Sequence, residues 1–347
     1  QDTRFFIHKY KGDSLTNLDK FIAVFDDGKP GSGKFFMKID HLEMTNGHFR
    51  VSDDNLGTVP VDFKEMNGAL NNLVVKGPNI NADITKLTFL DKRGVRVKDL
   101  ITSFSMTPTS RVLKPFAVET EETFIKGDVA MRYKKGDLKY FTEKVNLDVK
   151  LEKSKVATND LKYFYNEFGA NNILYFNTKA SGTLNNLKLQ NTHLSDKNGS
   201  EIIGNFNLQN LFVKTNPFRV EANLDRLNIN RSNAVALLPN ILGNTLPVQL
   251  EKLGRINLVG DVAYQDFYVD VDVEAVTDLG FATADVELWN VNKKQDASYK
   301  GDLVLDAFDI GKLIENEDLG FATLTASVDG KSFDPKFFNT IIKSEVL

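Results

Sequence analysis

Apolar and polar residues alternate along much of the chain. In the run YVDVDVEAV at 268–276, Val269, Val271 and Val273 alternate with acidic residues. Successive side chains of a strand point to opposite faces, so this run has one apolar and one charged face. The same alternation recurs in three other segments, at 147–151, 218–224 and 303–307. Strands buried on both faces would show continuous apolar runs, so we expect a mostly antiparallel sheet with one face in water.

Turn signals divide these runs into short strands. Asn-Gly and Asp-Gly pairs favour the positive φ angles of tight hairpins and recur at 27–28, 46–47, 198–199 and 329–330. Other segments carry apolar faces at helical spacing, with capping residues or prolines near their starts. These predicted short helices are 158–169, starting at Thr158 or Asn159, 231–243, starting at Ser232, and 245–254, 308–316 and 333–342. Pro239 should end or kink the second of them. We expect most of them to lie against the apolar face of the sheet.

Internal repeats indicate stacked units. The sequence DLGFAT occurs at 278–283 and again at 318–323. A strand with Leu-Asp, followed closely by a short helix, occurs at 147–148, 224–225 and 305–306. Units of this kind stack because one alone cannot bury its apolar face. We therefore predict one continuous array with a β-rich groove segment at 1–145, repeat units at 146–222 and 223–303, and a partial unit at 304–347.

These elements predict a mainly β fold, an elongated, curved, mostly antiparallel sheet array of the β-taco, or repeating-groove, type with short interspersed helices. Two sheets that meet fully pack about 10 Å apart. If they are splayed, their apolar faces line a trough that is too apolar to stand open to water. Such a trough would suit acyl chains. The 26 Phe residues fit this lining and equally fit an ordinary β-sheet core.

Composition excludes several classes of function. The chain has no cysteine, which excludes a disulfide scaffold, a thiolate metal site and a cysteine nucleophile. Lys and Arg number 43 against 47 Asp and Glu, without the basic excess of a nucleic-acid binder. No run approaches the roughly 18–20 consecutive apolar residues that span a bilayer. The chain begins at Gln1 without a signal segment, so we expect a piece of a longer protein.

Motifs that resemble catalytic or metal-binding sequences have simpler explanations. GKPGSGKF at 28–35 matches the Gly and Lys of a P-loop, but Phe35 stands where Ser or Thr would hold Mg²⁺. We expect a turn there, followed by a strand. The four histidines lack metal-ligand spacing, and no nucleophile elbow or distinctive carboxylate pair stands out. The sequence therefore predicts no catalytic residue, no metal and no cofactor.

Four segments carry a family resemblance. They are VFDDGKPGSGKFFMKIDHLEMTNGHFRV (24–51), NLDVKLEKSKVATNDLKYF (146–164), NPFRVEANLDRLNINRSNAVALLPNILG (216–243) and LVLDAFDIGKLIENEDLGFATLTASVDGKSFDPK (303–336). In these segments the chain resembles the TamB proteins of the AsmA-like superfamily. The shared motifs are structural and include no catalytic signature.

The resemblance implies a periplasmic segment of a long protein anchored in the bacterial inner membrane, with the anchor helix outside this chain. Proteins of this family look like bridge-like carriers that move phospholipid between the inner and outer membranes. They are also associated with TamA, an outer-membrane assembly barrel. The resemblance thus implies phospholipid as the ligand and a TamA-like barrel as a possible partner of regions absent here.

Two functions compete for this chain. The first is a non-catalytic lipid conduit, whose candidate lining residues are Val220, Leu224, Val269, Val271, Val273, Leu303 and Leu305. Its candidate capping residues, on the predicted helices, are Phe164, Phe168, Leu237 and Leu238. The second is a scaffold for outer-membrane protein assembly, whose exposed sheet edges pair with client strands. A secreted β-rich adhesin or glycan-active protein is a weaker alternative, because sugar binding usually uses exposed aromatic platforms and Trp289 is the only tryptophan.

Overall fold

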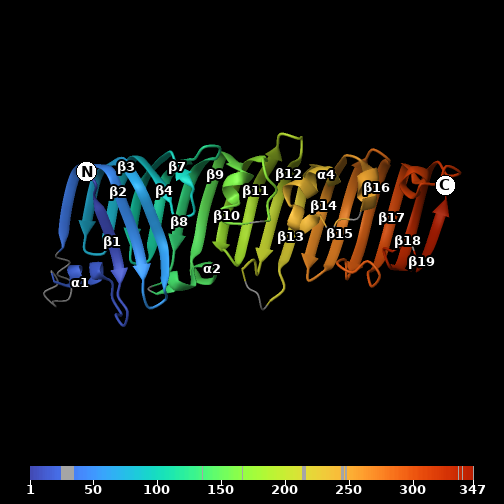
Figure 1. Cartoon of the computed structure of the whole chain (residues 1–347). Helices are drawn as coiled ribbons and strands as arrows, with labels where there is room; N and C mark the ends of the chain where they lie inside the picture. The colour runs from blue at the N-terminus through green and yellow to red at the C-terminus, as the bar shows by residue number, and fades with distance from the viewer. Residues whose placement is uncertain are drawn as a thin grey trace. The chain divides into compact units, whose positions relative to one another are not determined.

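The computed structural model describes most of the chain. The described residues are 1–24, 35–134, 136–165, 167–212, 216–243, 246, 248–334, 336–337 and 339–346. Most of the regular structure is β-strand, and the helices are short (Figure 1). The predicted mainly β, mostly antiparallel fold with interspersed helices is confirmed. The chain divides into two compact units, Gln1–Val156 and Ala157–Leu347. The first boundary predicted from the sequence lies after residue 145.

The first unit is a sheet whose strands follow one another in chain order. Its elements are β1 (Arg4–Lys9), α1 (Asn17–Ala23), β2 (Phe36–Asp53), β3 (Thr58–Lys76), β4 (Asn79–Asp91), β5 (Arg96–Val97), β6 (Asp99–Thr107), β7 (Ser110–Glu119), β8 (Phe124–Arg132), η1 (Asp137–Tyr140), α2 (Phe141–Lys144) and β9 (Asn146–Ala157). β1 is parallel to β2, and the other pairings are antiparallel, with β4 contacting both β5 and β6. The strand predicted after the P-loop-like segment is β2; the segment itself, at 28–34, lies outside the described residues.

Aromatic side chains from neighbouring strands form the core of this unit. The ring centroids of Phe63 and Phe89 lie 4.3 Å apart, and Phe49 follows at 6.3 Å from Phe63. Phe89 is buried together with Met66 and Val97. Large apolar surfaces of this kind supply most of the stabilisation of a one-faced sheet.

The second unit is an antiparallel sheet with helices between some of its strands. Its elements are α3 (Thr158–Leu161), β10 (Ile173–Thr183), β11 (Asn186–Asp196), β12 (Glu201–Gln209), β13 (Arg219–Ile229), α4 (Arg231–Leu237), α5 (Pro239–Leu242), η2 (Val248–Leu253), β14 (Ile256–Gln265), β15 (Tyr268–Thr277), β16 (Gly280–Trp289), β17 (Ser298–Asp309), α6 (Ile310–Ile314), β18 (Phe321–Lys331) and β19 (Asn339–Val346). Each strand from β10 to β18 pairs with the next one along the chain.

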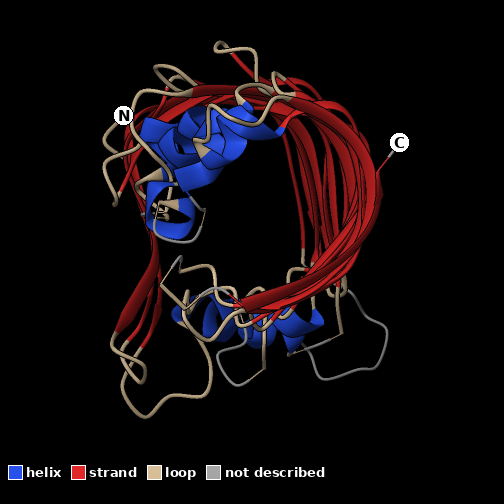
Figure 2. Cartoon of the chain, turned by 90° about the vertical axis from the view of Figure 1, so that its right-hand side faces the viewer, coloured by secondary structure: helices blue, strands red, loops and turns tan. Residues whose placement is uncertain are grey.

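Helices recur in the chain at a regular interval. α3, α4 and α6 directly follow β9, β13 and β17, which is every fourth strand. These are the strands that carry the repeated Leu-Asp pair. Figure 2 shows that the strands are curved and that the helices at the top of the view lie on the inner side of the curve. The repeat seen in the sequence thus corresponds to a regular placement of helices along the sheet.

Several predicted helix boundaries are wrong. The helix predicted over 158–169 ends at Leu161, where a run of aromatic residues with modest helix propensity follows. The expected break at Pro239 is confirmed, since that residue divides the helix predicted over 231–243 into α4 and α5. Asn230 rather than Ser232 caps α4, because its side chain accepts a hydrogen bond from the Asn233 amide at 2.8 Å. These corrections shorten the helices without moving them along the sheet.

The remaining predicted helices also change. The segment 245–254 forms a 3₁₀-helix over Val248–Leu253, and 308–316 is helical only in α6. The helix predicted over 333–342 is wrong, since β19 occupies Asn339–Val346. β-Branched residues such as Thr340, Ile341 and Ile342 favour strands. No helix among the described residues has the length and apolar character to cross a membrane.

Candidate functional site

One face of the second unit's sheet consists of apolar rows that run across the strands, and we call it the apolar face. The hairpin-side row, nearest the turn between β14 and β15, contains Val220, Tyr264, Val269, Leu288 and Tyr299. The middle row contains Ala222, Val262, Val271, Val286, Gly301 and Val328. The buried row contains Leu224, Gly260, Val273, Ala284, Leu303 and Ala326. Residues directly opposite on neighbouring strands share a face, so each row is continuous.

Protein atoms cover only part of the apolar face. In the buried row, Leu224, Val273 and Ala326 are 8%, 5% and 4% exposed, while Gly260, Ala284 and Leu303 keep an intermediate exposure. Every residue of the middle and hairpin-side rows keeps an intermediate exposure. Two sheets packed face to face would bury both of these rows in their interior. The two rows are therefore apolar surface that the described residues shield incompletely.

All seven predicted lining residues lie on the apolar face. Leu224, Val273 and Leu303 belong to the buried row, Val271 to the middle row, and Val220 and Val269 to the hairpin-side row. Leu305 lies two residues beyond Leu303 on β17 and is also partly buried. The alternation therefore brings together residues from three strands that are distant in sequence. Their contact with lipid remains a prediction.

The intervening strands contribute residues to the apolar face that were not among the predicted lining residues. β14 supplies Tyr264 and β16 supplies Val286 and Leu288. On β14 the pattern is weak because Val259 points to the opposite face and is 42% exposed. On β16 the signal was present, since acidic residues alternate with Val286 and Leu288. The period-two pattern is therefore clear on β16 and weak on β14.

The structure brings together three of the four predicted capping residues. Phe168 precedes Gly169, whose amide donates to the Leu237 carbonyl at 2.9 Å, and Leu238 follows at the end of α4. A Cβ on Gly169 would lie 1.8 Å from the Ala236 carbonyl oxygen, so the segment after α3 packs directly on the backbone of α4. Phe164 is 52% exposed. Whether these residues cap the apolar face remains a prediction.

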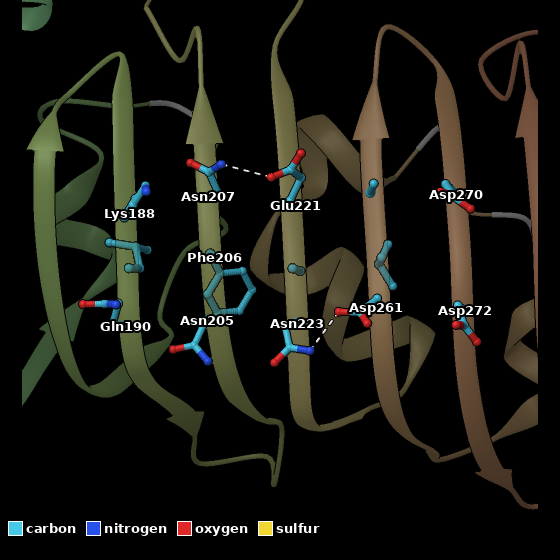
Figure 3. Close-up of a pocket in the computed structure, with 14 residues that line it drawn as sticks. Lys188, Gln190, Asn205, Phe206, Asn207, Glu221, Asn223, Asp261, Asp270 and Asp272 are labelled. Atoms are coloured by element: carbon cyan, nitrogen blue, oxygen red, sulfur yellow. Dashed lines mark hydrogen bonds between the residues drawn. The ribbon is translucent and has the colours of Figure 1, made fainter.

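The opposite face of the same strands is acidic, and we call it the polar face. Asp261, Asp272, Asp285 and Asp302 stand directly opposite one another on four successive strands. Figure 3 views this face, and helical segments lie behind the sheet, on the side of the apolar face. Like charges directly opposite on neighbouring strands destabilise a sheet. The polar face therefore favours exposure to water and ions rather than burial against another protein layer.

Reversing one charge in this row should stabilise the protein. We expect Asp285→Lys, with a carboxylate on each side, to raise the free energy of unfolding by about 0.5–1 kcal/mol at low ionic strength. The gain should shrink as salt screens the charges. Urea unfolding at two salt concentrations measures it, with Asp318→Lys, in the turn after α6, as control. Equal effects of the two variants would contradict the assignment of the repulsion to the row.

Tyr268 on the polar face should titrate at unusually high pH. Its hydroxyl donates to Glu287 Oε1 at 2.5 Å, and this hydrogen bond raises the pKa of Tyr268 to about 12. Because the folded-state pKa is raised, the stabilisation is complete below the ordinary value of 10.0 and is lost as pH rises through about 12. Absorbance titration should show a late phenolate step that Tyr268→Phe removes. A wild-type titration without that step would contradict the assignment.

A shallow hollow of about 450 Å³ lies on the polar face over β11 to β15. Ala263 stands between Glu221 and Asp270 in the register, and its small side chain leaves the space. As Figure 3 shows, Asn207 donates to Glu221 at 3.0 Å and Asn223 donates to Asp261 at 2.8 Å. Nine of its lining residues are polar or charged, and Leu189, Phe206, Ala222, Val262 and Ala263 add apolar surface, so the hollow is mixed in character.

The histidines make local pairs with acidic residues. His48 Nε2 lies 2.6 Å from Asp62 Oδ1, and His193 Nε2 lies 2.9 Å from Glu201 Oε1. Within the described ranges, no group of three or more His, Cys, Asp or Glu residues has the geometry to hold a metal ion. The apolar face is thus the most extensive feature from which a function can be argued.

Comparison with protein families, curated proteins and solved structures gives no match to this chain.

Proposed function

We propose that this chain is a non-catalytic, lipid-conducting segment of a periplasmic bridge-like protein, in which the apolar face holds the acyl chains of phospholipid. The observation that carries the proposal is the continuity of the middle and hairpin-side rows across β13 to β17 without full cover by protein. The resemblance to TamB proteins supports the location and an anchor in the inner membrane. Head groups would stay in water at the rim of the sheet.

The energetics favour an apolar ligand. Contiguous apolar surface is rarely left open to water, and each Å² removed from water contributes about 25 cal/mol. Acyl chains need no hydrogen-bond partner, and the side chains of the middle row offer none. Five strand intervals from β13 to β18 span about 24 Å at about 4.8 Å per strand, which is long enough for an extended acyl chain. The rows thus match a flexible, unbranched ligand in both chemistry and length.

Native mass spectrometry of the purified protein tests the proposal. We expect co-isolated phospholipid, lost on delipidation and replaced by dodecyl maltoside added as a soluble single-chain probe. Calorimetry on the delipidated protein then measures the affinity for that probe. A protein that carries no lipid when isolated and binds no dodecyl maltoside afterwards would contradict the proposal.

An edge strand favours a second function, a scaffold for outer-membrane protein assembly. Within the part of the chain that the structure describes, β19 pairs only with β18. Ile341 and Ile342 on β19 are 64% and 59% exposed. An exposed, apolar edge of this kind can add a client strand. Photocrosslinking from Ile341 in cells should give polypeptide adducts under this function, whereas the lipid function predicts phospholipid adducts from the apolar face.

A further inference from the structure

Two loops at the hairpin side of the second unit are joined into one structure. They are 290–297, between β16 and β17, and 332–338, between β18 and β19, of which 332–334 and 336–337 are described. The Phe333 amide donates to the Lys294 carbonyl at 2.7 Å, and the Ser332 amide donates to the Ala297 carbonyl at 2.7 Å. Ser332 and Ala297 are each 1% exposed, so these bonds are sheltered from water. The loops therefore hold a fixed position relative to each other.

Lysines gather on these joined loops and at the strand end beside them. Lys293, Lys294, Lys331 and Lys336 are all exposed, and we call them the basic rim. Within the described residues, none of the four makes an ion pair, although the loops also carry Asp296 and Asp334. The rim thus has an excess of two positive charges, in contrast to the acidic polar face. Unpaired ammonium groups at a fixed site are suited to an anionic ligand.

An aromatic pair connects the basic rim to the apolar face. Phe333 stacks on Tyr299, with the ring centroids 5.7 Å apart and an angle of 9° between the ring planes. Tyr299 is the last member of the hairpin-side row, and its hydroxyl hydrogen-bonds to Thr340. A Cβ on Gly330 would lie 2.5 Å from the Tyr299 ring, so only glycine lets the ring lie across β18. The rim is therefore held at the border of the partly exposed rows.

We propose that the basic rim binds the phosphate head group of an anionic lipid whose acyl chain lies on the apolar face. This inference rests on the proposed function and adds the class of lipid to it. The ammonium groups supply charge-assisted hydrogen bonds to phosphate oxygens. The Tyr299 ring, apolar with a polar tip, is of the type that lipid head-group regions favour. Phe333 beside it, and Phe337, which is 57% exposed, add apolar aromatic surface.

Calorimetry with delipidated protein and three probes tests the inference. The probes are dodecyl phosphate, dodecyl maltoside and inorganic phosphate. The triple variant Lys293→Gln, Lys294→Gln, Lys336→Gln removes three charges of the rim. Its matched control is Lys179→Gln, Lys188→Gln, Lys197→Gln, which removes three exposed lysines from β10, β11 and the hairpin after β11. We expect the rim variant to lose about tenfold in affinity for dodecyl phosphate, equivalent to ~1.4 kcal/mol, and to keep its affinity for dodecyl maltoside.

Every other outcome overturns the rim as a lipid site, and two of these outcomes overturn the proposed function as well. Equal loss of dodecyl phosphate binding in the two triple variants would show a general charge effect and overturn the rim as a site. Unchanged binding in the rim variant would overturn it as well, while leaving the proposed function intact. If inorganic phosphate binds at the rim but neither dodecyl probe binds, the rim is an anion site without a lipid, and both proposals fail. If none of the three probes binds, both fail too.

Discussion

Val271→Asp is expected to weaken the binding of dodecyl maltoside by roughly a hundredfold, because a polar group placed against an acyl chain without a partner costs about 2–3 kcal/mol. Val271 lies in the middle row, between Val262 and Val286. The carboxylate introduced by the substitution would interrupt the row at the centre of the apolar face. Calorimetry on the delipidated variant measures the loss.

A control on the same strand separates this effect from a general effect of added charge. Val276 also lies on β15, but on the polar face, where it is 53% exposed. Val276→Asp should leave the affinity for dodecyl maltoside unchanged. Val271→Thr, which adds a hydroxyl at nearly constant shape, should give an intermediate loss and guards against a folding defect in Val271→Asp. Wild-type affinity in both Val271 variants would contradict the assignment of the middle row.

Leu224→Ala is expected to lower the free energy of unfolding by about 3 kcal/mol, as deletions of buried leucine side chains do. Leu224 is 8% exposed and stands between Gly204 and Gly260 on the two neighbouring strands. Neither glycine has a side chain that could fill the space. A Cβ on Gly260 would lie 2.2 Å from the Asp272 carbonyl oxygen, so that glycine cannot be replaced to compensate. Urea unfolding followed by circular dichroism measures the change.

The comparison with Val269→Ala makes this prediction specific to the buried row. Val269 lies in the hairpin-side row and is only partly buried, so its truncation should lower the free energy of unfolding by about 1 kcal/mol or less. The difference between the two variants reports how unevenly protein covers the apolar face. Similar losses at both positions would mean that a protein layer covers both rows, which contradicts the open face.

Period-two alternation was the most informative signal in the sequence. It identified the strands of Val220, Val271 and Leu303, and it predicted that these residues share one face. Strand alternation works because the side-chain period does not depend on distant contacts. The prediction of a helix over 333–342 is wrong because the structure of this segment does depend on distant contacts. Its apolar residues fit helical spacing, but β-branched residues paired with β18 make β19, and such pairing cannot be read from a local window.

The part of the candidate site that depends on contacts between distant segments could not be predicted. Tyr299 lies across Gly330, and Phe333 stacks on Tyr299. Neither relation has a sequence signature, because each depends on the register between β17 and β18. The joining of the two lysine-bearing loops likewise follows from backbone hydrogen bonds at Ser332 and Phe333. The apolar residues of the rows could thus be predicted from the sequence, whereas the border formed by Tyr299 and Phe333 is visible only in the structure.

Photocrosslinking along β15 tests the central claim most directly. A photoreactive amino acid is placed in turn at each position from Val269 to Asp272, and phospholipid adducts are quantified by mass spectrometry after irradiation in cells. An open apolar face predicts adducts at Val269 and Val271 and few at Asp270 and Asp272, in the period of two that the strand imposes. Adducts spread evenly over the four positions, or none at any of them, would contradict the claim that the partly exposed rows hold acyl chains.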